Sequence, residues 1–489
     1  MLFNSYSFLF VFLPIAFFGF FFIARVSQKL AALWLGLASL LFYSWWDWHF
    51  TSILLLSILV NYSFGMHLRK QGPNSKPLLA LAVTLNLLTL GYFKYVNFFV
   101  HSFAFVTGMQ FAWQNIALPI GISFYTFTQI AFLVDTARGK AEEAYFPHYL
   151  LFVTYFPHLI AGPILHHAEM MPQFARKDTY TLRAESISTG ITIFSFGLFK
   201  KVMLADSISR YADYAFSQTN ASQLNFLTAW VGALAYAMQI YFDFSGYTDM
   251  AIGISRMFNI NLPANFDSPY KSKSIVEFWR RWHMTLSRFL RDYLYVPLGG
   301  NRKGQMSRYT NLIITMALGG LWHGAGWTFL VWGLLHGCYL MINHAAQYLK
   351  ISFNHFISWA LTFFAVLIAW VFFRAADMHT ALHILRTMFG MQGIVLPNAI
   401  GAHLHTHLDR LASLGVRFAD ISLGEHATLP EALRWIIGLM AIALFLPNLH
   451  EVMEKCWRAN LLWAIPTLSA LLVSLYYMTR ISQFLYFQF

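Results

Sequence analysis

Residues 8–23 read FLFVFLPIAFFGFFFI, sixteen residues without a single charge. An apolar run of this kind predicts a helix that enters a membrane. No basic segment precedes the run, and no small-x-small cleavage site follows it. We therefore expect a retained first span and not a cleaved signal peptide.

The composition of the whole chain agrees with this first run. Of 489 residues, 58% are hydrophobic, 18% are aromatic and 11% are charged, whereas soluble proteins have roughly 45–50% apolar and about 25% charged residues. So few charges cannot coat a water-soluble globule of this size, and a disordered chain lacks the apolar content to collapse. We predict an all-α polytopic membrane protein with room for around ten spans of about 20 residues each.

Further apolar runs give about 11–13 transmembrane or re-entrant helices in one integral membrane domain, residues 1–489. Several runs are short or contain Gly and Pro, and irregular backbone survives at membrane depth only when it is buried in protein or lines a cavity. The remaining candidate runs are Leu30–Trp46, Thr51–Met66, Leu78–Phe93, Leu118–Val134, Tyr149–Leu165, Ile187–Leu204, Leu224–Ile254, Leu312–Leu321, Phe329–Asn343, Ile357–Phe373, Leu433–Leu446 and Leu461–Met478.

Basic residues set the expected orientation. The net charge is +12, and residues 255–309 carry three Lys and seven Arg against three acidic residues, a net charge of +7. Because Lys and Arg mark cytoplasmic loops, we assign 255–309 to the cytoplasmic face. In a membrane protein such charge also attracts anionic lipid headgroups, so we expect membrane lipids and no nucleic acid as partners. Residues 391–431 form the longest polar excursion near the C-terminus, which predicts a small extramembrane part.

Residues 319–327, GGLWHGAGW, place His323 in an apolar run among four glycines and two tryptophans, Trp322 and Trp327. An ionisable group at membrane depth is costly and suggests function. A buried neutral imidazole can take a proton from a hydroxyl, so His323 is the candidate general base. The alternative is a simple helix contact, because Gly320 and Gly324 form a GxxxG pair.

The segment at residues 278–293, FWRRWHMTLSRFLRDY, interleaves cations with aromatic residues around His283 and Trp282. Its arginines could neutralise the phosphates of a donor such as a CoA ester through bidentate contacts. An amphipathic helix that binds lipid headgroups explains the arginines equally well, but it explains His283 less well. The candidate donor-binding residues are Arg280, Arg281, Arg288 and Arg291.

Two polar interruptions of apolar runs complete the candidate site. The sequence YFDFSGYTD, residues 241–249, carries Tyr241, Asp243, Ser245 and Asp249. The aspartates could orient a histidine or pair with arginines, and a structural buried salt bridge is the alternative for each. His158 lies in FPHLIAGP, residues 156–163, a break whose Pro and Gly suit a cavity wall as well as an ordinary kink.

Metal chemistry is not expected. Cys338 and Cys456 are 118 positions apart, with no CxxC pair, so a cysteine-based metal centre or a disulfide framework is not predicted. His403, His405 and His407 alternate in a polar loop and would share a face only on a strand. We therefore predict no bound metal or cofactor.

At these motifs the sequence resembles the bacterial membrane-bound O-acyltransferases (MBOAT), in the branch of the alginate O-acetylases. The resemblance covers nearly the whole chain, and the stretches that carry it are WRRWH (279–283), DYLYVPLGGN (292–301), LWHG (321–324), YFDFSGY (241–247), WVFFR (370–374) and YFQF (486–489). It implies a ring of helices around a central passage. It also implies that His323 is catalytic and that His283 is a second essential histidine.

The resemblance implies that an acyl group passes from a cytoplasmic donor to an acceptor at the outer face. We expect a multi-pass enzyme of the bacterial inner membrane that moves acetyl from acetyl-CoA to a hydroxyl, for O-acetylation of an exported or cell-wall polysaccharide. A periplasmic or extracellular esterase-like protein would accept the acetyl group. Trp322, Trp282, Tyr241, Asp243, Ser245, Asp249 and His158 would line the passage. The alternatives are a lipid or protein acceptor, and a transporter or flippase without covalent chemistry.

Overall fold

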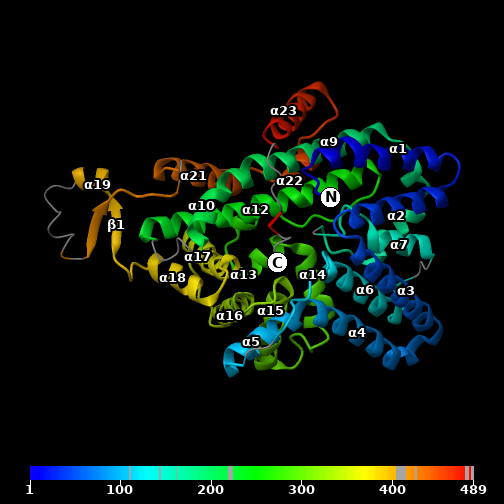
Figure 1. Ribbon diagram of the computed structural model, residues 1–489, viewed down its shortest axis with the longest axis horizontal. Coiled ribbons are helices and arrows are strands. Elements are labelled where there is room, and N and C mark those ends of the chain that lie inside the picture. The colour runs from blue at the N-terminus through cyan, green and yellow to red at the C-terminus, as the bar shows by residue number, and fades with distance from the viewer. Residues whose placement is uncertain are drawn as a thin grey trace. The chain divides into compact units, whose positions relative to one another are not determined.

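The computed structural model describes residues 1–109, 112–141, 145–160, 162–217, 224–403, 413, 415–424, 427–478 and 484–485. In these residues the regular elements are helices, apart from two short strands, β1 (Ile394–Pro397) and β2 (Val416–Ala419), which pair in parallel with Ile394 opposite Val416 (Figure 1). The prediction of an all-α protein is therefore confirmed. Both strands lie in the predicted polar excursion 391–431.

Several helices are long and apolar enough to cross a membrane. Among the described residues there are five such helical stretches, or six if the consecutive helices α21 (Leu429–Phe445) and α22 (Leu449–Lys455) count as one span. The five are Trp48–Gln71, Lys76–Thr107, Ala184–Phe216, Trp327–Tyr348 and His355–Arg374. The prediction of 11–13 helices counted re-entrant helices as well as full spans, so it is a count of a wider class than these five or six stretches. In the predicted runs that contain Gly and Pro, the helices α6 (Ile122–Ala137) and α7 (Phe146–Thr154) are indeed short, with 16 and 9 residues.

The chain divides into two compact units, and each is described by itself. The first comprises residues 1–199, 246–265 and 449–488. Besides α6, α7, α22 and the end of α12 (Phe226–Met257), its elements are η1 (Phe8–Phe12), α1 (Leu13–Ala24), α2 (Gln28–Ser44), α3 (Trp48–Gln71), η2 (Gly72–Ser75), α4 (Lys76–Leu90), η3 (Gly91–Tyr95), α5 (Val96–Thr107), α8 (His167–Ala175), η4 (Lys177–Tyr180), α9 (Ala184–Phe199) and α23 (Leu461–Tyr477).

The phenylalanines of the first run serve two environments in this unit. Phe8 and Phe12 are buried and pack on Phe42 and Phe156, with ring centroids 5.2–6.1 Å apart. Phe10, by contrast, is 62% exposed. Since exposed aromatic residues are stable in lipid but not in water, this helix suits a position at the edge of a membrane protein.

The second unit comprises residues 200–245 and 266–448. With the start of α12, the strands and α21, its elements are η5 (Lys200–Ala205), α10 (Asp206–Phe216), η6 (Pro269–Lys271), α13 (Ile275–Arg281), α14 (Met284–Leu290), η7 (Arg291–Tyr295), α15 (Gly304–His323), α16 (Trp327–Tyr348), α17 (His355–Arg374), α18 (Met378–Met388) and α19 (Asn398–His403). This unit carries both predicted catalytic histidines.

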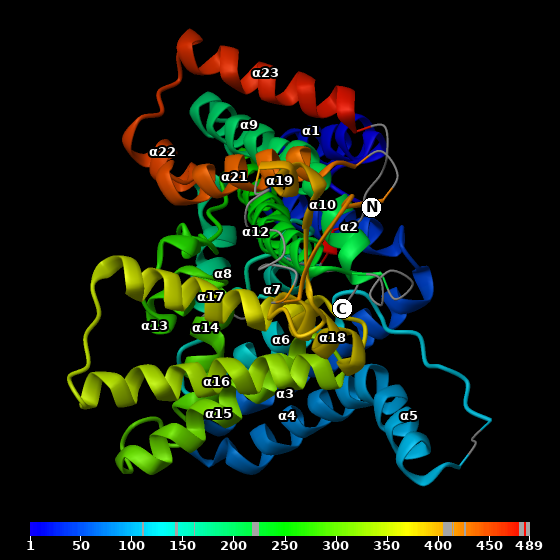
Figure 2. The ribbon, with the colours of Figure 1, turned by 90° about the vertical axis from the view of Figure 1, so that its left-hand side faces the viewer.

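The helices α15 and α16 form a tight antiparallel pair in the second unit (Figure 2). A Cβ atom on Gly320 would lie against the carbonyl oxygen of Phe329 and 3.1 Å from the Cα of Gly333. A Cβ on Gly333 would in turn meet the carbonyl oxygen of Met316. These glycines let the two backbones touch, so the interpretation of Gly320 as a helix-packing residue is confirmed. His323 lies three positions after Gly320, at the end of α15.

The helices α13 and α14 do not form one continuous amphipathic helix. Trp282 is extended and His283 adopts a left-handed conformation, with φ 43° and ψ 54°, so the chain turns sharply between the two. Residues with a Cβ rarely adopt positive φ, and such strain is often found at functional sites. The turn buries Trp279, Trp282 and His283 and leaves Arg280 exposed.

Candidate active site

His323 is enclosed by aromatic rings. It is the last residue of α15, and its side chain is 5% exposed. The centroid of its imidazole lies 4.9 Å from that of Trp322, 5.0 Å from that of Trp332 and 5.2 Å from that of Phe373. Such a shell excludes bulk water from the imidazole.

His283 belongs to the same cluster. It is fully buried, and its ring makes an edge contact with Phe244, with centroids 4.9 Å apart. Burial lowers the pKa of His283 from 6.5 to about 3, because the charged form would lose its hydration. His283 is therefore neutral at physiological pH.

The two histidines lie close together although 40 positions separate them in the chain. The centroids of the His283 and His323 rings are 6.4 Å apart, and Trp322 lies 6.3 Å from His283. A shared role required such proximity, because proton transfer needs hydrogen-bond reach or one bridging water. The predicted proximity is therefore confirmed, whereas their catalytic roles remain a prediction.

The four candidate donor-binding arginines differ in their surroundings. Arg281 contacts Glu277 at 3.1 Å and Asp267 at 3.4 Å, and Arg291 contacts the neighbouring Asp292 at 2.7 Å. Arg288 is half-buried, and Arg280 is exposed. No ion pair or hydrogen bond joins the side chain of Arg280 to another residue of the described part of the chain. Arg280 is consequently the arginine whose charge is most available to a phosphate.

Asp243 takes part in a buried ion pair. Its carboxylate lies 2.6 Å from Nζ of Lys201, and that ammonium is also 2.8 Å from the carboxylate of Asp206. This is the structural alternative foreseen for Asp243. Tyr241 is buried against Phe266 and Tyr270, at 6.2 and 5.4 Å, and Ser245 is also buried.

His158 and Asp249 belong to the first unit, whereas His283 and His323 belong to the second. His158 is buried, and its Nε2 lies 2.9 Å from the carbonyl oxygen of Phe152. Asp249 is half-buried. Their place along the passage remains a prediction.

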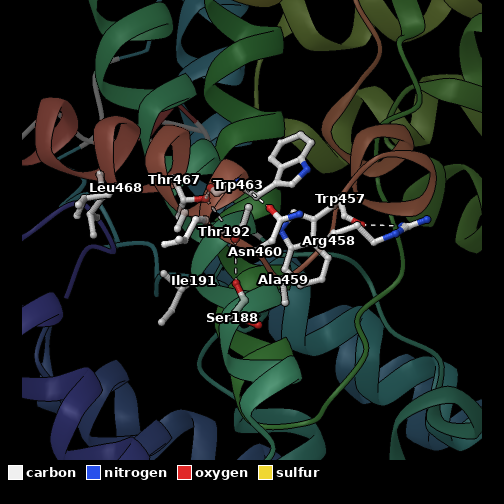
Figure 3. A pocket seen from close by; sticks show the side chains of 13 residues that line it. Ser188, Ile191, Thr192, Trp457, Arg458, Ala459, Asn460, Trp463, Thr467 and Leu468 are labelled. Atoms are coloured by element: carbon white, nitrogen blue, oxygen red, sulfur yellow. Dashed lines mark hydrogen bonds between the residues drawn. The ribbon is translucent and has the colours of Figure 1, made fainter.

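A cavity of about 450 Å³ in the first unit lies between α9 and α23 (Figure 3). Its walls are mostly apolar, and Trp457, Arg458 and Asn460 line it from the segment just before α23. Arg458 donates a hydrogen bond to the carbonyl oxygen of Trp457 at 2.8 Å. The lining includes none of the predicted site residues, so this cavity is separate from the chemistry inferred from the sequence.

Sequence reasoning missed His336, a further buried histidine of the second unit. It lies on α16 one turn after Trp332, is fully buried, and its ring centroid is 4.8 Å from that of Trp332. The indole Nε1 of Trp279 donates a hydrogen bond to its Nδ1 at 3.2 Å. The signal was present in the sequence, because His336 is an ionisable residue inside the apolar run 329–343, just as His323 is within its own run.

A metal site is not found among the residues that the structure describes: no three His, Cys, Asp or Glu side chains come together there. His405 and His407 lie outside the described residues, and the side chain of His403 is not described either.

Comparison with known proteins gives consistent matches. The family described as MBOAT, membrane-bound O-acyltransferase family, matches residues 40–378. A peptidoglycan O-acetyltransferase of Helicobacter pylori is 39% identical over 100% of this chain and 98% of its own length. A probable alginate O-acetylase of Pseudomonas syringae pv. tomato is 45% identical over 80% of this chain and 75% of its own length. A teichoic acid D-alanyltransferase of Bacillus subtilis is 29% identical over 46% of this chain and 58% of its own length.

Proposed function

Because this chain belongs to the membrane-bound O-acyltransferase family, we propose that it transfers acetyl groups to hydroxyls of a cell-wall or exported polysaccharide. It is a multi-pass membrane O-acyltransferase, and family membership argues against a transporter without covalent chemistry. Peptidoglycan is the favoured final acceptor, since the relative named for peptidoglycan matches the whole chain, whereas the relative named for alginate matches 80% of it.

One observation carries the mechanism: the imidazoles of His283 and His323 lie 6.4 Å apart within a closed aromatic shell. His323 takes the proton of the attacking hydroxyl, and the hydroxyl oxygen then bonds to the acyl carbon of the donor. The thiolate leaves and is protonated, so an ester and a free thiol are formed. His283 orients the donor or assists proton transfer. The shell of rings around His323 favours a small acyl group such as acetyl.

The donor in this proposal is acetyl-CoA. It reaches the site from the cytoplasm, where the basic segment 255–309 meets its phosphates, with Arg280 as the main contact. The acceptor is a hydroxyl of an esterase-like protein outside the bacterial inner membrane, which completes transfer to the polysaccharide. Membrane lipids surround the exposed apolar helix faces.

The test is expression of the wild-type gene in a bacterial strain that lacks its own peptidoglycan O-acetyltransferase. Acetate released from purified peptidoglycan by mild alkali should reappear with the wild-type protein and stay absent with the His323→Ala variant. Acetate in alginate but not in peptidoglycan would move the acceptor to the exported polysaccharide. Acetate in a lipid fraction alone would contradict a polysaccharide acceptor.

The transfer of acetyl from labelled acetyl-CoA should also be measured with purified protein in detergent. Release of free CoA with a simple hydroxyl acceptor supports the proposed donor. If CoA is not released while acetylation occurs in cells, the donor is another thioester.

A further inference from the structure

Two buried N–H groups in the ring cluster around Trp332 have no acceptor among the residues that the structure describes. They belong to Trp332 and His336, whose side chains are 1% and 0% exposed. The indole Nε1 of Trp332 and the imidazole Nε2 of His336 form no hydrogen bond to any part of the chain that the structure describes. Since the two residues are four positions apart on α16, both project from the same face of that helix.

The hydrogen bond from Trp279 determines which nitrogen of His336 is protonated. An indole N–H only donates, so Nδ1 of His336 must accept the bond at 3.2 Å. A neutral imidazole carries one proton, which is then on Nε2. Nε2 of His336 is therefore a hydrogen-bond donor, and no described residue accepts a bond from it.

Buried donors without acceptors are uncommon, because each costs roughly 1–3 kcal/mol of desolvation. Two such donors on one helix face call for an acceptor, and the described part of the chain does not supply one. The ring of Trp332 contacts both imidazoles, with its centroid 5.0 Å from that of His323 and 4.8 Å from that of His336. Because Trp332 contacts both imidazoles, an acceptor for its N–H would lie in the same ring cluster as His323.

We propose that Nε2–H of His336 and Nε1–H of Trp332 bind the carbonyl oxygen of the acyl group during transfer, an inference that rests on the proposed function. When the hydroxyl oxygen attacks the acyl carbon, its proton goes to His323 and the electrons of the C=O double bond move onto the oxygen. The two N–H groups stabilise this oxyanion. The C=O bond then re-forms, the C–S bond breaks, and the thiolate takes a proton as it leaves.

A pair of substitutions at His336 separates the donor from the acceptor. Asparagine places an oxygen near the position of Nδ1, so His336→Asn keeps an acceptor for Trp279 and loses the Nε2 donor. Glutamine places an NH₂ near the position of Nε2, so His336→Gln keeps the donor and loses that acceptor. We expect His336→Asn to lower kcat by about 10²–10³-fold with an unchanged KM for the donor, and His336→Gln to lower it less.

Trp332→Phe supplies an independent test, because it removes the N–H and keeps most of the ring. Its kcat should fall by a similar factor. The matched control is Trp230→Phe, which deletes an indole N–H that already donates to the carbonyl oxygen of Met388 at 2.9 Å. This control should keep the wild-type kcat.

The proposal is overturned if His336→Asn or Trp332→Phe retains the wild-type kcat. It is also overturned if His336→Gln is the more damaging of the pair, since the bond to Trp279 would then be what matters. Wild-type protein in the same assay distinguishes a failure of this inference from a failure of the proposed function. If wild-type protein transfers no acyl group, the proposed function itself fails.

Discussion

Arg280 should bind the donor, whereas Arg281 beside it should not. The structure separates these neighbours, because Arg281 is held by Glu277 and Asp267 while Arg280 is exposed. A charge-assisted hydrogen bond is worth about 1.5–3 kcal/mol, which corresponds to roughly 10- to 150-fold in binding. Arg280→Ala should therefore raise the KM for acetyl-CoA by about 10-fold or more and leave kcat nearly unchanged.

Arg281→Ala is the matched control for this prediction. It breaks partly exposed ion pairs that are worth about 0–1 kcal/mol, so the KM for the donor should change by less than about fivefold. Arg280→Lys should recover part of the affinity, because the charge remains but the planar fork is lost. The KM of the wild type should rise with ionic strength, since Arg280 is exposed to solvent.

The assay measures the transfer of labelled acetyl from acetyl-CoA at several donor concentrations, with purified protein in detergent. Equal effects of Arg280→Ala and Arg281→Ala on the KM would refute the argument from ion pairing. An unchanged KM in both variants would instead favour an interaction of this segment with lipid headgroups.

Three further predictions concern the histidines and the helix contact. His323→Ala should reach the membrane in normal amounts and lose about 10²–10⁴-fold in transfer rate; retained polysaccharide acetylation would contradict its role as the base. Since the pKa of His283 is about 3 in the folded state and 6.5 when unfolded, protonation opposes folding, so stability is complete above about pH 6.5 and falls toward pH 3, by about 2 kcal/mol at pH 5. His283→Asn, which tolerates positive φ, should flatten this part of the melting-temperature profile between pH 5 and 7.5; an unchanged profile would show that another group titrates. Gly333→Ala places a methyl against the carbonyl of Met316 and should destabilise the fold by about 1–3 kcal/mol, whereas Gly438→Ala, with no atom within 4 Å of the added Cβ, should leave the melting temperature unchanged or raise it.

Much of the site was predictable from local chemistry. An ionisable residue in an apolar run is costly wherever the run folds, so His323 was found from the residues around it. The same argument applied to His336, whose apolar run also carries glycines, Gly333 and Gly337, so the residues around it gave the same kind of signal. The proximity of His283 and His323 followed only from the assumption of a shared role, because nothing in the spacing of 40 residues fixes a distance.

The sequence by itself determined that the chain lies in a membrane and that its secondary structure is helical. A chain with 58% hydrophobic and 11% charged residues is stable in lipid. In lipid its backbone N–H and C=O groups must bond to one another, and helices achieve this. Only the tertiary structure decided which polar groups meet. In it Lys201 pairs with Asp243, and Trp279 donates a hydrogen bond to one nitrogen of His336. Arg281 has carboxylate partners, whereas Arg280 has none among the described residues. Hydrogen bonds and ion pairs act over about 3–4 Å between side chains that are distant in the chain, so composition and periodicity do not determine which of them meet, whereas helix packing does.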